Sequence, residues 1–123
     1  MNSRTALPAL LAAFVLLTLA YSVAIPLGEA ADEVPHFAYV QYLVTQQRLP
    51  PPEGTVLGES HQPPLYYFLG ALATAWIPRE NFQVANNPNF VLYDPRTPNL
   101  FLHSNEAFPY RDDVLAWHWV RLL

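Results

Sequence analysis

The chain begins with a long run of apolar residues that contains no charge. This run extends over residues 6–27 and reads ALPALLAAFVLLTLAYSVAIPL. About 20 residues of helix, at roughly 1.5 Å each, cross the roughly 30 Å of bilayer hydrocarbon, so the run predicts a transmembrane helix. Arg4 precedes the run and acidic residues follow it. Because short positively charged segments stay in the cytoplasm, we expect residues 1–5 to form a cytoplasmic tail at the inner (plasma) membrane and the rest to be extracytoplasmic.

A cleaved signal peptide is the alternative interpretation of this run. Ser22-Val23-Ala24 has the small–x–small pattern of a cleavage site. The run is longer than the roughly 7–15 apolar residues of a signal peptide, which favours a retained helix. Both interpretations export the residues that follow, and cleavage would produce a small secreted protein.

Residues 34–47 predict a second helix with one apolar face. The apolar positions have helical spacing and are Phe37, Val40, Leu43 and Val44. The polar positions on the other side are Gln41, Gln46, Gln47 and Arg48. Asp32 stands at the N-cap position, Glu33 suits the positive end of the helix dipole, and the prolines and glycine of residues 50–54 end the helix. A helix of about 14 residues is too short to span a bilayer, so we expect it to lie on the membrane surface or beneath other helices.

An uncharged run predicts a third helix over Pro63–Ile77. One stripe of this helix is bulky and apolar and consists of Leu65, Phe68, Leu69, Leu72 and Trp76. The opposite face consists of Tyr66, Tyr67, Gly70, Ala71 and Thr74. A helix without charge on any side is buried in protein or in lipid. Because about 14 residues do not span a bilayer, we expect this helix to be interfacial or re-entrant.

Residues 79–111 show no periodicity and predict an irregular loop. The segment is rich in asparagine and proline: Asn81, Asn86, Asn87, Asn89, Asn99, Asn105, Pro88, Pro95, Pro98 and Pro109. Its aromatic residues indicate packing against other parts of the protein: Phe82, Phe90, Tyr93, Phe101, Phe108 and Tyr110.

A further helix is expected to start at Asp112-Asp113, with Trp117 and Trp119 placed as an aromatic belt. The apolar pattern reaches Leu123 without a stop signal, so we expect the N-terminal piece of a larger membrane protein or a truncated gene product. The sequence thus predicts a mainly α membrane protein. It has one transmembrane helix, an extracytoplasmic loop (28–78) with two membrane-parallel helices, an irregular insertion (79–111) and the start of the next helix (112–123).

Composition excludes several classes of function. Charged residues make up 13% of the chain, and the net charge is −4 with no lysine. A chain without a basic stripe does not neutralise nucleic-acid phosphates, so nucleic acid is excluded as a partner. The absence of cysteine excludes disulfides, a thiolate nucleophile and a zinc finger.

Two short segments carry residues that could do chemistry. The first is Asp32-Glu33-x-x-His36, in which Asp32 and His36 are four apart and share a helix face. Asp32 could act as a general base, with His36 orienting it or sharing a divalent cation. From spacing alone, cap and dipole roles for the two acids are the more common explanation. The second segment is the turn that contains His61, followed by Tyr66 and Tyr67, whose ordinary role is to anchor a helix at the headgroup level.

The order of these features resembles the opening of the membrane-integral GT-C glycosyltransferases. The residues concerned are G-E-A-A-D-E-V-P-H-F-A-Y-V-Q-Y-L, R-L-P-P-P and E-S-H-Q-P-P-L-Y-Y-F-L-G-A-L, in that order after one spanning helix. The sequence is most similar to the bacterial branch with the protein O-mannosyltransferase-like and aminoarabinose-transferase-like enzymes. The resemblance covers about residues 6–77; residues 79–111 look like a lineage-specific insertion, and the family continues with further transmembrane helices after Arg121.

The resemblance implies transfer of a hexosyl or pentosyl group from a polyprenyl-phosphate donor to an acceptor on the extracytoplasmic face. Asp32 takes the position of the catalytic base, and Glu33 supports it or, with Asp32, helps to hold a divalent cation such as Mg²⁺ or Mn²⁺. His36, His61 and Tyr66 are then supporting or substrate-binding residues, with His61 near the donor phosphate. The implied partners are the lipid bilayer, the polyprenyl-phosphate donor and the missing C-terminal transmembrane part, without which we expect little activity.

A non-catalytic alternative stays open at this point. In it, a single-pass membrane protein binds a partner through its extracytoplasmic aromatic loop and its uncharged helix.

Overall fold

The computed structural model describes residues 3–51, 58–80, 82–94, 96, 99–104 and 106–123. Some residues that we expected to end a helix or to belong to the irregular loop lie outside this part of the chain: Pro52, Glu53, Gly54, Asn81, Pro95, Pro98 and Asn105. Within the described residues the protein is mainly α, with four helices and one short pair of strands.

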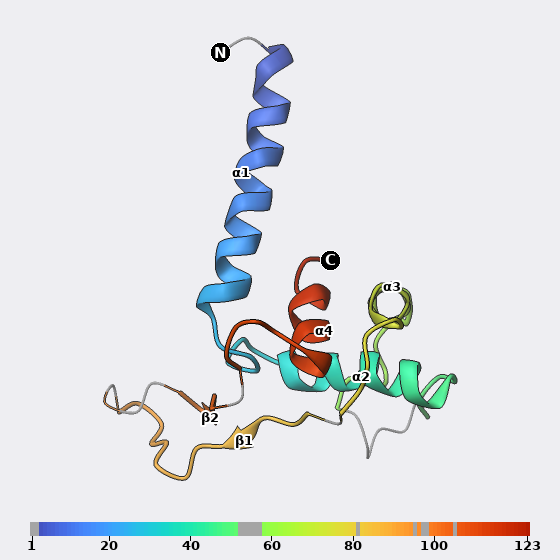
Figure 1. Cartoon of the computed structure of the whole chain (residues 1–123), viewed down its shortest axis with the longest axis vertical. Helices are drawn as coiled ribbons and strands as arrows, with labels where there is room; N and C mark the ends of the chain where they lie inside the picture. The colour runs from blue at the N-terminus through green and yellow to red at the C-terminus, as the bar shows by residue number, and fades with distance from the viewer. Residues whose placement is uncertain (1–2, 52–57, 81, 95, 97–98, 105) are drawn as a thin grey trace.

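Helix α1 (Ser3–Ala24) projects away from the rest of the molecule (Figure 1). Only 6% of its most apolar window is buried, and Phe14, Leu16 and Val23 are each about two-thirds exposed. Among the described residues it is the one helix long and apolar enough to cross a membrane, a test that a signal sequence also passes. The helix ends three residues earlier than the predicted run, because Pro26 cannot continue it.

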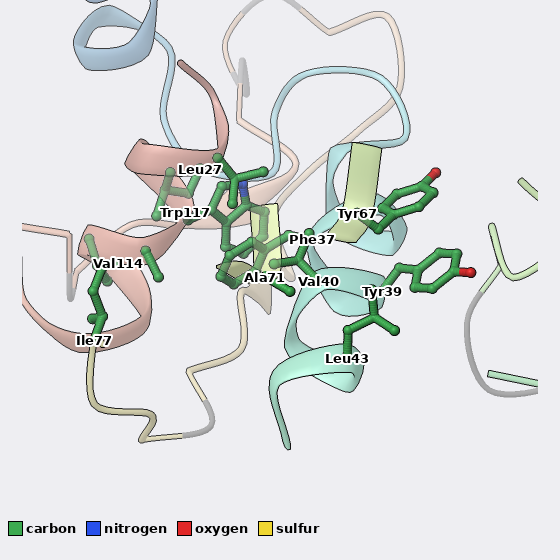
Figure 2. Packing of buried hydrophobic residues seen from close by; sticks show 12 residues of the cluster. Leu27, Phe37, Tyr39, Val40, Leu43, Tyr67, Ala71, Ile77, Val114 and Trp117 are labelled. Carbon is green, nitrogen blue, oxygen red and sulfur yellow. The ribbon is translucent and has the colours of Figure 1, made fainter. Parts of the chain in front are cut away.

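Helix α2 (Glu33–Gln46) runs roughly perpendicular to α1, to one side of its C-terminal end, and carries much of the core (Figures 1 and 2). Phe37, Val40 and Leu43 are buried, which confirms the predicted apolar face. The predicted outer face is wrong at Gln41, whose side-chain amide donates a hydrogen bond to Asp113 at 3.1 Å. Gln47 ends the helix in the left-handed conformation, and its N–H donates to the carbonyl of Leu43.

Helix α3 (Leu65–Thr74) is shorter than predicted, because Pro63 and Pro64 precede it and residues 75–77 turn away after it. It packs on α2 with the face of smaller and more polar residues: Tyr67, Gly70, Ala71 and Thr74. A Cβ on Gly70 would approach Val40 to 3.0 Å, so the glycine permits the close contact between the helices. The bulky apolar stripe predicted for this helix is exposed instead, from 47% at Phe68 to 72% at Leu65.

Helix α4 (Asp112–Val120) closes the core against α3 and α2. Trp117 is buried and stacks on Phe37 with ring centroids 4.3 Å apart, so its expected role in an aromatic belt is wrong (Figure 2). Trp119 is 44% exposed and meets the ring of Trp76 edge to face. Asp113, the second residue of the helix, is fully buried and accepts hydrogen bonds from Gln41, Arg79 and the backbone N–H groups of Glu80 and Phe82.

The segment between α3 and α4 is mostly irregular, as predicted, with a short antiparallel pair of strands. Strand β1 (Ala85–Asn86) pairs with β2 (Phe101–Leu102) in the register Ala85 to Leu102. The expectation that its aromatic residues pack holds for Phe82, which meets Trp117 edge to face. It is wrong for Tyr93 and Phe108, whose exposed fractions are 93% and 83%.

Candidate functional site

A pocket of about 670 Å³ lies where α1 ends and where α2 and α3 begin. One wall is mostly apolar and comes from α1 and the residue after it: Phe14, Leu17, Tyr21 and Ile25, together with the small polar residues Thr18 and Ser22. The other end is polar and collects side chains from the starts of α2 and α3 and from the end of α4: Glu33, His36, Tyr66, Tyr67 and Arg121. The pocket is therefore amphipathic, with its polar end just beyond a helix of membrane-spanning length.

Arg121 holds the polar end together. Its Nη1 donates to the carbonyls of Ser22 and Ile25 at 2.8 and 2.6 Å, and its Nη2 donates to the carbonyl of Pro26 at 2.8 Å. The Ser22 carbonyl belongs to the last turn of α1 and has no intrahelical donor, because residue 26 is a proline. The carbonyls of Ile25 and Pro26 belong to the two residues just after the helix. The remaining two donors, Nε and the second Nη2 hydrogen, bind the carboxylate of Glu33. The guanidinium thus uses all five of its N–H groups inside the protein.

The carboxylate of Glu33 also has several hydrogen-bond partners inside the protein. Besides Arg121, its carboxylate accepts hydrogen bonds from Trp117 Nε1 at 2.8 Å and from the backbone N–H of Gly28 at 2.9 Å. Burial by itself would raise the pKa of Glu33, but the Arg121, Trp117 and Gly28 donors outweigh it and hold that pKa below its usual range. Glu33 therefore stays ionised and fixes the turn that precedes α2.

Asp32 differs from Glu33 in its exposure and in its hydrogen bonds. Its side chain is exposed, and within the described residues no hydrogen-bond donor reaches its carboxylate. It occupies the N-cap position of α2 but in the left-handed conformation (φ 57°, ψ 10°) and makes no side-chain capping bond. The capping role expected for Asp32 is therefore wrong. Left-handed backbone at a non-glycine residue is uncommon and often marks a functional position.

His36 and Tyr67 form a second polar pair in the pocket. His36 Nδ1 lies 2.7 Å from the Tyr67 hydroxyl, which joins the first turn of α2 to the first turn of α3. Tyr67 also stacks on Tyr39, with ring centroids 3.9 Å apart. The hydroxyls of both tyrosines point away from the rest of the buried cluster (Figure 2).

Of the two remaining predicted site residues, Tyr66 lies in the pocket and His61 lies outside it. Tyr66 lines the pocket, and its hydroxyl donates to the carbonyl of Val120 at 3.3 Å. Burial and the nearby Glu33 carboxylate raise the pKa of Tyr66, so its phenol stays protonated. His61 does not line the pocket; its side chain is 66% exposed and lies 3.9 Å from Glu59. It does not cap α3, whose N-cap residue is Pro64 and which has no side-chain capping bond. The structure thus brings together Glu33, His36 and Tyr66 in the pocket. Asp32 does not line the pocket, although its sequence neighbours Ala31 and Glu33 do.

No known family, curated protein or solved structure matches this chain. The resemblance described above therefore remains a proposal, and its support comes from the residues and the geometry of the pocket.

A divalent cation does not fit the residues that were predicted to hold it. The part of the chain that the structure describes contains no group of three or more metal-ligating side chains in reach of one ion. Both oxygens of Glu33 are taken by N–H donors, so a cation would have to displace Arg121. Asp32 alone offers one carboxylate, which is too few ligands for a protein-held site.

No pattern in the sequence indicated the role of Arg121. It lies 88 residues after Glu33, and a single arginine near the end of an apolar segment usually faces water or a headgroup. Only the fold brings it to the end of α1. The same holds for Trp117, whose spacing indicated a membrane interface and whose indole N–H instead binds Glu33.

Proposed function

We propose that this chain is the N-terminal part of a GT-C-type glycosyltransferase in the plasma membrane. In this proposal α1 is a retained transmembrane helix with its N-terminus in the cytoplasm. The enzyme transfers a sugar from a polyprenyl-phosphate donor to an acceptor on the extracytoplasmic face. The family resemblance of residues 6–77 and the amphipathic pocket support it together.

The shape of the pocket is the observation that carries the proposal. A lipid-linked sugar phosphate has a long apolar chain and a charged head, and it must be bound where a membrane helix meets the aqueous side. The pocket has an apolar wall on α1 and a polar end at the starts of α2 and α3. A fully polar substrate would bury no apolar surface on this wall. A polyprenyl chain would bury its surface against Phe14, Leu17 and Tyr21.

The two neighbouring acids have separate roles in this mechanism. Glu33, clamped by Arg121 and Trp117, holds the turn that carries Asp32. Asp32, with an uncommitted carboxylate, removes the proton of the acceptor hydroxyl. The hydroxyl oxygen bonds to the anomeric carbon, the bond from that carbon to the phosphate oxygen breaks, and polyprenyl phosphate leaves with the electron pair. General base catalysis of this kind contributes about 10²–10⁴-fold.

The test is sugar transfer by the full gene product in proteoliposomes, with labelled polyprenyl-phosphate hexoses and pentoses as donors. Asp32→Asn should lower transfer by about 100-fold or more. Asp112→Asn is the matched control, because Asp112 is also a left-handed aspartate at a helix start (φ 49°). Its sequence neighbours Arg111 and Asp113 do not line the pocket, whereas Ala31 and Glu33, the neighbours of Asp32, do. Equal activity of Asp32→Asn and wild type would overturn the role of Asp32, and no transfer by wild type from any donor would overturn the proposed function.

A non-catalytic role as a partner-binding membrane protein is the second candidate. The exposed stripe of α3 and the exposed rings of Tyr93 and Phe108 favour it. Under this alternative, a stable partner should be captured equally well by wild type and by Asp32→Asn.

A further inference from the structure

The pocket has few polar groups that are still available to a ligand. The guanidinium of Arg121 already donates all five of its N–H groups to Glu33 and to the carbonyls at the end of α1. The Tyr66 hydroxyl donates to Val120. Among the described residues that line the pocket, His36 is left with a ring nitrogen, Nε2, that no other group binds. The chemistry of that nitrogen depends on which nitrogen of His36 carries the hydrogen.

Tyr67 decides the position of that hydrogen. Its hydroxyl is the atom 2.7 Å from His36 Nδ1, and Tyr67 is only 3% exposed. A buried phenol must place its single O–H hydrogen on an acceptor, and the lone pair of an imidazole nitrogen is a better acceptor than another phenol oxygen. Burial and the neighbouring Glu59, Tyr39 and Tyr66 raise the pKa of Tyr67, which keeps this hydrogen on the phenol. With Nδ1 accepting, the hydrogen of a neutral imidazole lies on Nε2.

We propose that Tyr67 is a positioning residue that holds His36 as the Nε2–H tautomer, and that this N–H donates to a phosphate oxygen in the pocket. The ligand class is a polyprenyl phosphate whose chain lies on the α1 wall, with the phosphate a diester in the sugar donor and a monoester in the product. The inference rests on the proposed function and deepens it. It assigns the phosphate contact to His36, which lines the pocket. The resemblance implied this contact for His61, which lies outside the pocket.

The packing around Tyr67 supports a positioning role. Its ring stacks on Tyr39 with centroids 3.9 Å apart and is nearly parallel to the His36 ring at 5.8 Å, with interplanar angles of 17° for both pairs. The stack restricts the Tyr67 ring, and the short hydrogen bond restricts the imidazole. A histidine fixed in one tautomer and orientation is prepared to bind an anion without reorganising.

The first measurement is the tautomer of His36 in the full chain, reconstituted in phosphatidylcholine nanodiscs and labelled with ¹⁵N-histidine. The His36 signal is assigned by its loss in His36→Gln. We expect protonated Nε2 and unprotonated Nδ1 in wild type, and a mixture of tautomers in Tyr67→Phe. The control is Tyr39→Phe, which removes a hydroxyl from the same stack without touching His36 and should leave the tautomer unchanged. Protonated Nδ1 in neutral wild-type His36 overturns the proposal even if no variant folds.

The second measurement is binding of three probes to the same nanodiscs: decaprenyl phosphate, inorganic phosphate and phosphatidylglycerol. Tyr67→Phe should weaken decaprenyl phosphate roughly 3- to 10-fold, and His36→Ala at least as much. His36→Gln should keep part of the affinity, because its amide N–H can replace Nε2–H. Inorganic phosphate with the same variant pattern also supports the phosphate contact and shows that the lipid chain is not required. Preference for phosphatidylglycerol, or affinities that do not change in His36→Ala, overturns the contact.

The two proposals fail differently. If decaprenyl phosphate binds with the expected variant pattern but no sugar is transferred, the inference about His36 and Tyr67 stands and the proposed function fails. If sugar is transferred and Asp32→Asn abolishes it, while Tyr67→Phe changes neither the tautomer nor the affinity, the proposed function stands and this inference fails.

Discussion

Arg121 binds Glu33 across 88 residues of sequence and, with the same guanidinium, caps the end of α1. The two side chains are 12% and 13% exposed, so the pair is largely removed from water. One ion pair thus joins the membrane-length helix, the start of α2 and the end of α4. The stability and the site geometry depend on the same contact.

Replacing Arg121 should destabilise the protein strongly. Arg121→Gln leaves Glu33 charged and partly buried without its partner, which costs about 3 kcal/mol. Arg121→Lys keeps the charge but loses the fork of donors, so we expect an intermediate loss. Denaturant unfolding of the detergent-solubilised chain measures both.

The double variant Glu33→Gln/Arg121→Gln is the control for this prediction. It removes both charges, so its stability should exceed that of Arg121→Gln alone. A double variant that loses the sum of the two single losses would show that the charges act independently.

His103 makes stability depend on pH. Its Nδ1 lies 2.7 Å from Glu106 Oε1 and its Nε2 lies 2.8 Å from Glu29 Oε1, so both ring nitrogens face carboxylate oxygens. Ionised carboxylates only accept hydrogen bonds, which requires an imidazolium between them. Burial lowers the pKa of His103, but the hydrogen bonds to Glu106 and Glu29 outweigh it and raise that pKa above 6.5.

The sign of the pH effect follows from this shift. The stabilisation by His103 is fully present below pH 6.5 and is lost as the pH rises through the raised value in the folded protein. Burial raises the pKa of Glu29, but hydrogen bonds from Phe101, Leu100 and His103 lower it below 4.5, so its contribution is lost only in acid. The melting temperature of wild type should therefore fall as the pH is raised above 6.5, and the fall should be smaller in His103→Gln.

His61→Gln is the control for the His103 prediction, because His61 is exposed and 3.9 Å from its nearest carboxylate. The melting temperature of His61→Gln should depend on pH in the same way as that of wild type. If His103→Gln kept the full alkaline loss of wild type, the imidazolium bridge would be wrong.

Asp113→Asn should cost about 3–5 kcal/mol of folding free energy. Asp113 is fully buried, and its two oxygens accept four hydrogen bonds, one from Arg79 and two from backbone N–H groups. An asparagine turns an N–H₂ group toward some of these donors and leaves Arg79 without a counter-charge. Asp112→Asn, one residue away and tolerant of the left-handed conformation, should change stability by about 0.5 kcal/mol or less. Similar unfolding curves for the two variants would contradict the role of Asp113.

A retained α1 predicts that the protein keeps its first 24 residues and stays with membranes after alkaline carbonate washing. Intact-mass measurement of protein from its native host decides this directly. A mass that corresponds to cleavage after Ala24 would establish the signal-peptide alternative.

The sequence predicted the positions of the helices better than it predicted which of their faces pack on the rest of the protein. Residues 33–46 and 112–120 are helical because their apolar spacing and acidic starts are local properties. The pattern could not say which face of α3 packs on protein. Close approach to Val40 selects the face with Gly70, and the bulkier Leu65 and Leu72 are left outside.

The polar site depended on contacts that no local pattern shows. Asp32, Glu33 and His36 were found because they are adjacent in sequence, whereas Arg121 and Tyr67 reach them only through the fold. Spacing also could not separate the two acids, since one of them is clamped and the other is not because of partners distant in the chain.

The Arg121 contact also imposes an order in time. During synthesis α1 and the turn after it emerge long before residue 121, which is translated 88 residues after Glu33. Until then, neither the last carbonyls of α1 nor the Glu33 carboxylate has this guanidinium. The nascent chain must therefore rely on water or lipid headgroups at this point, and the pocket takes its final form only after translation has passed α4.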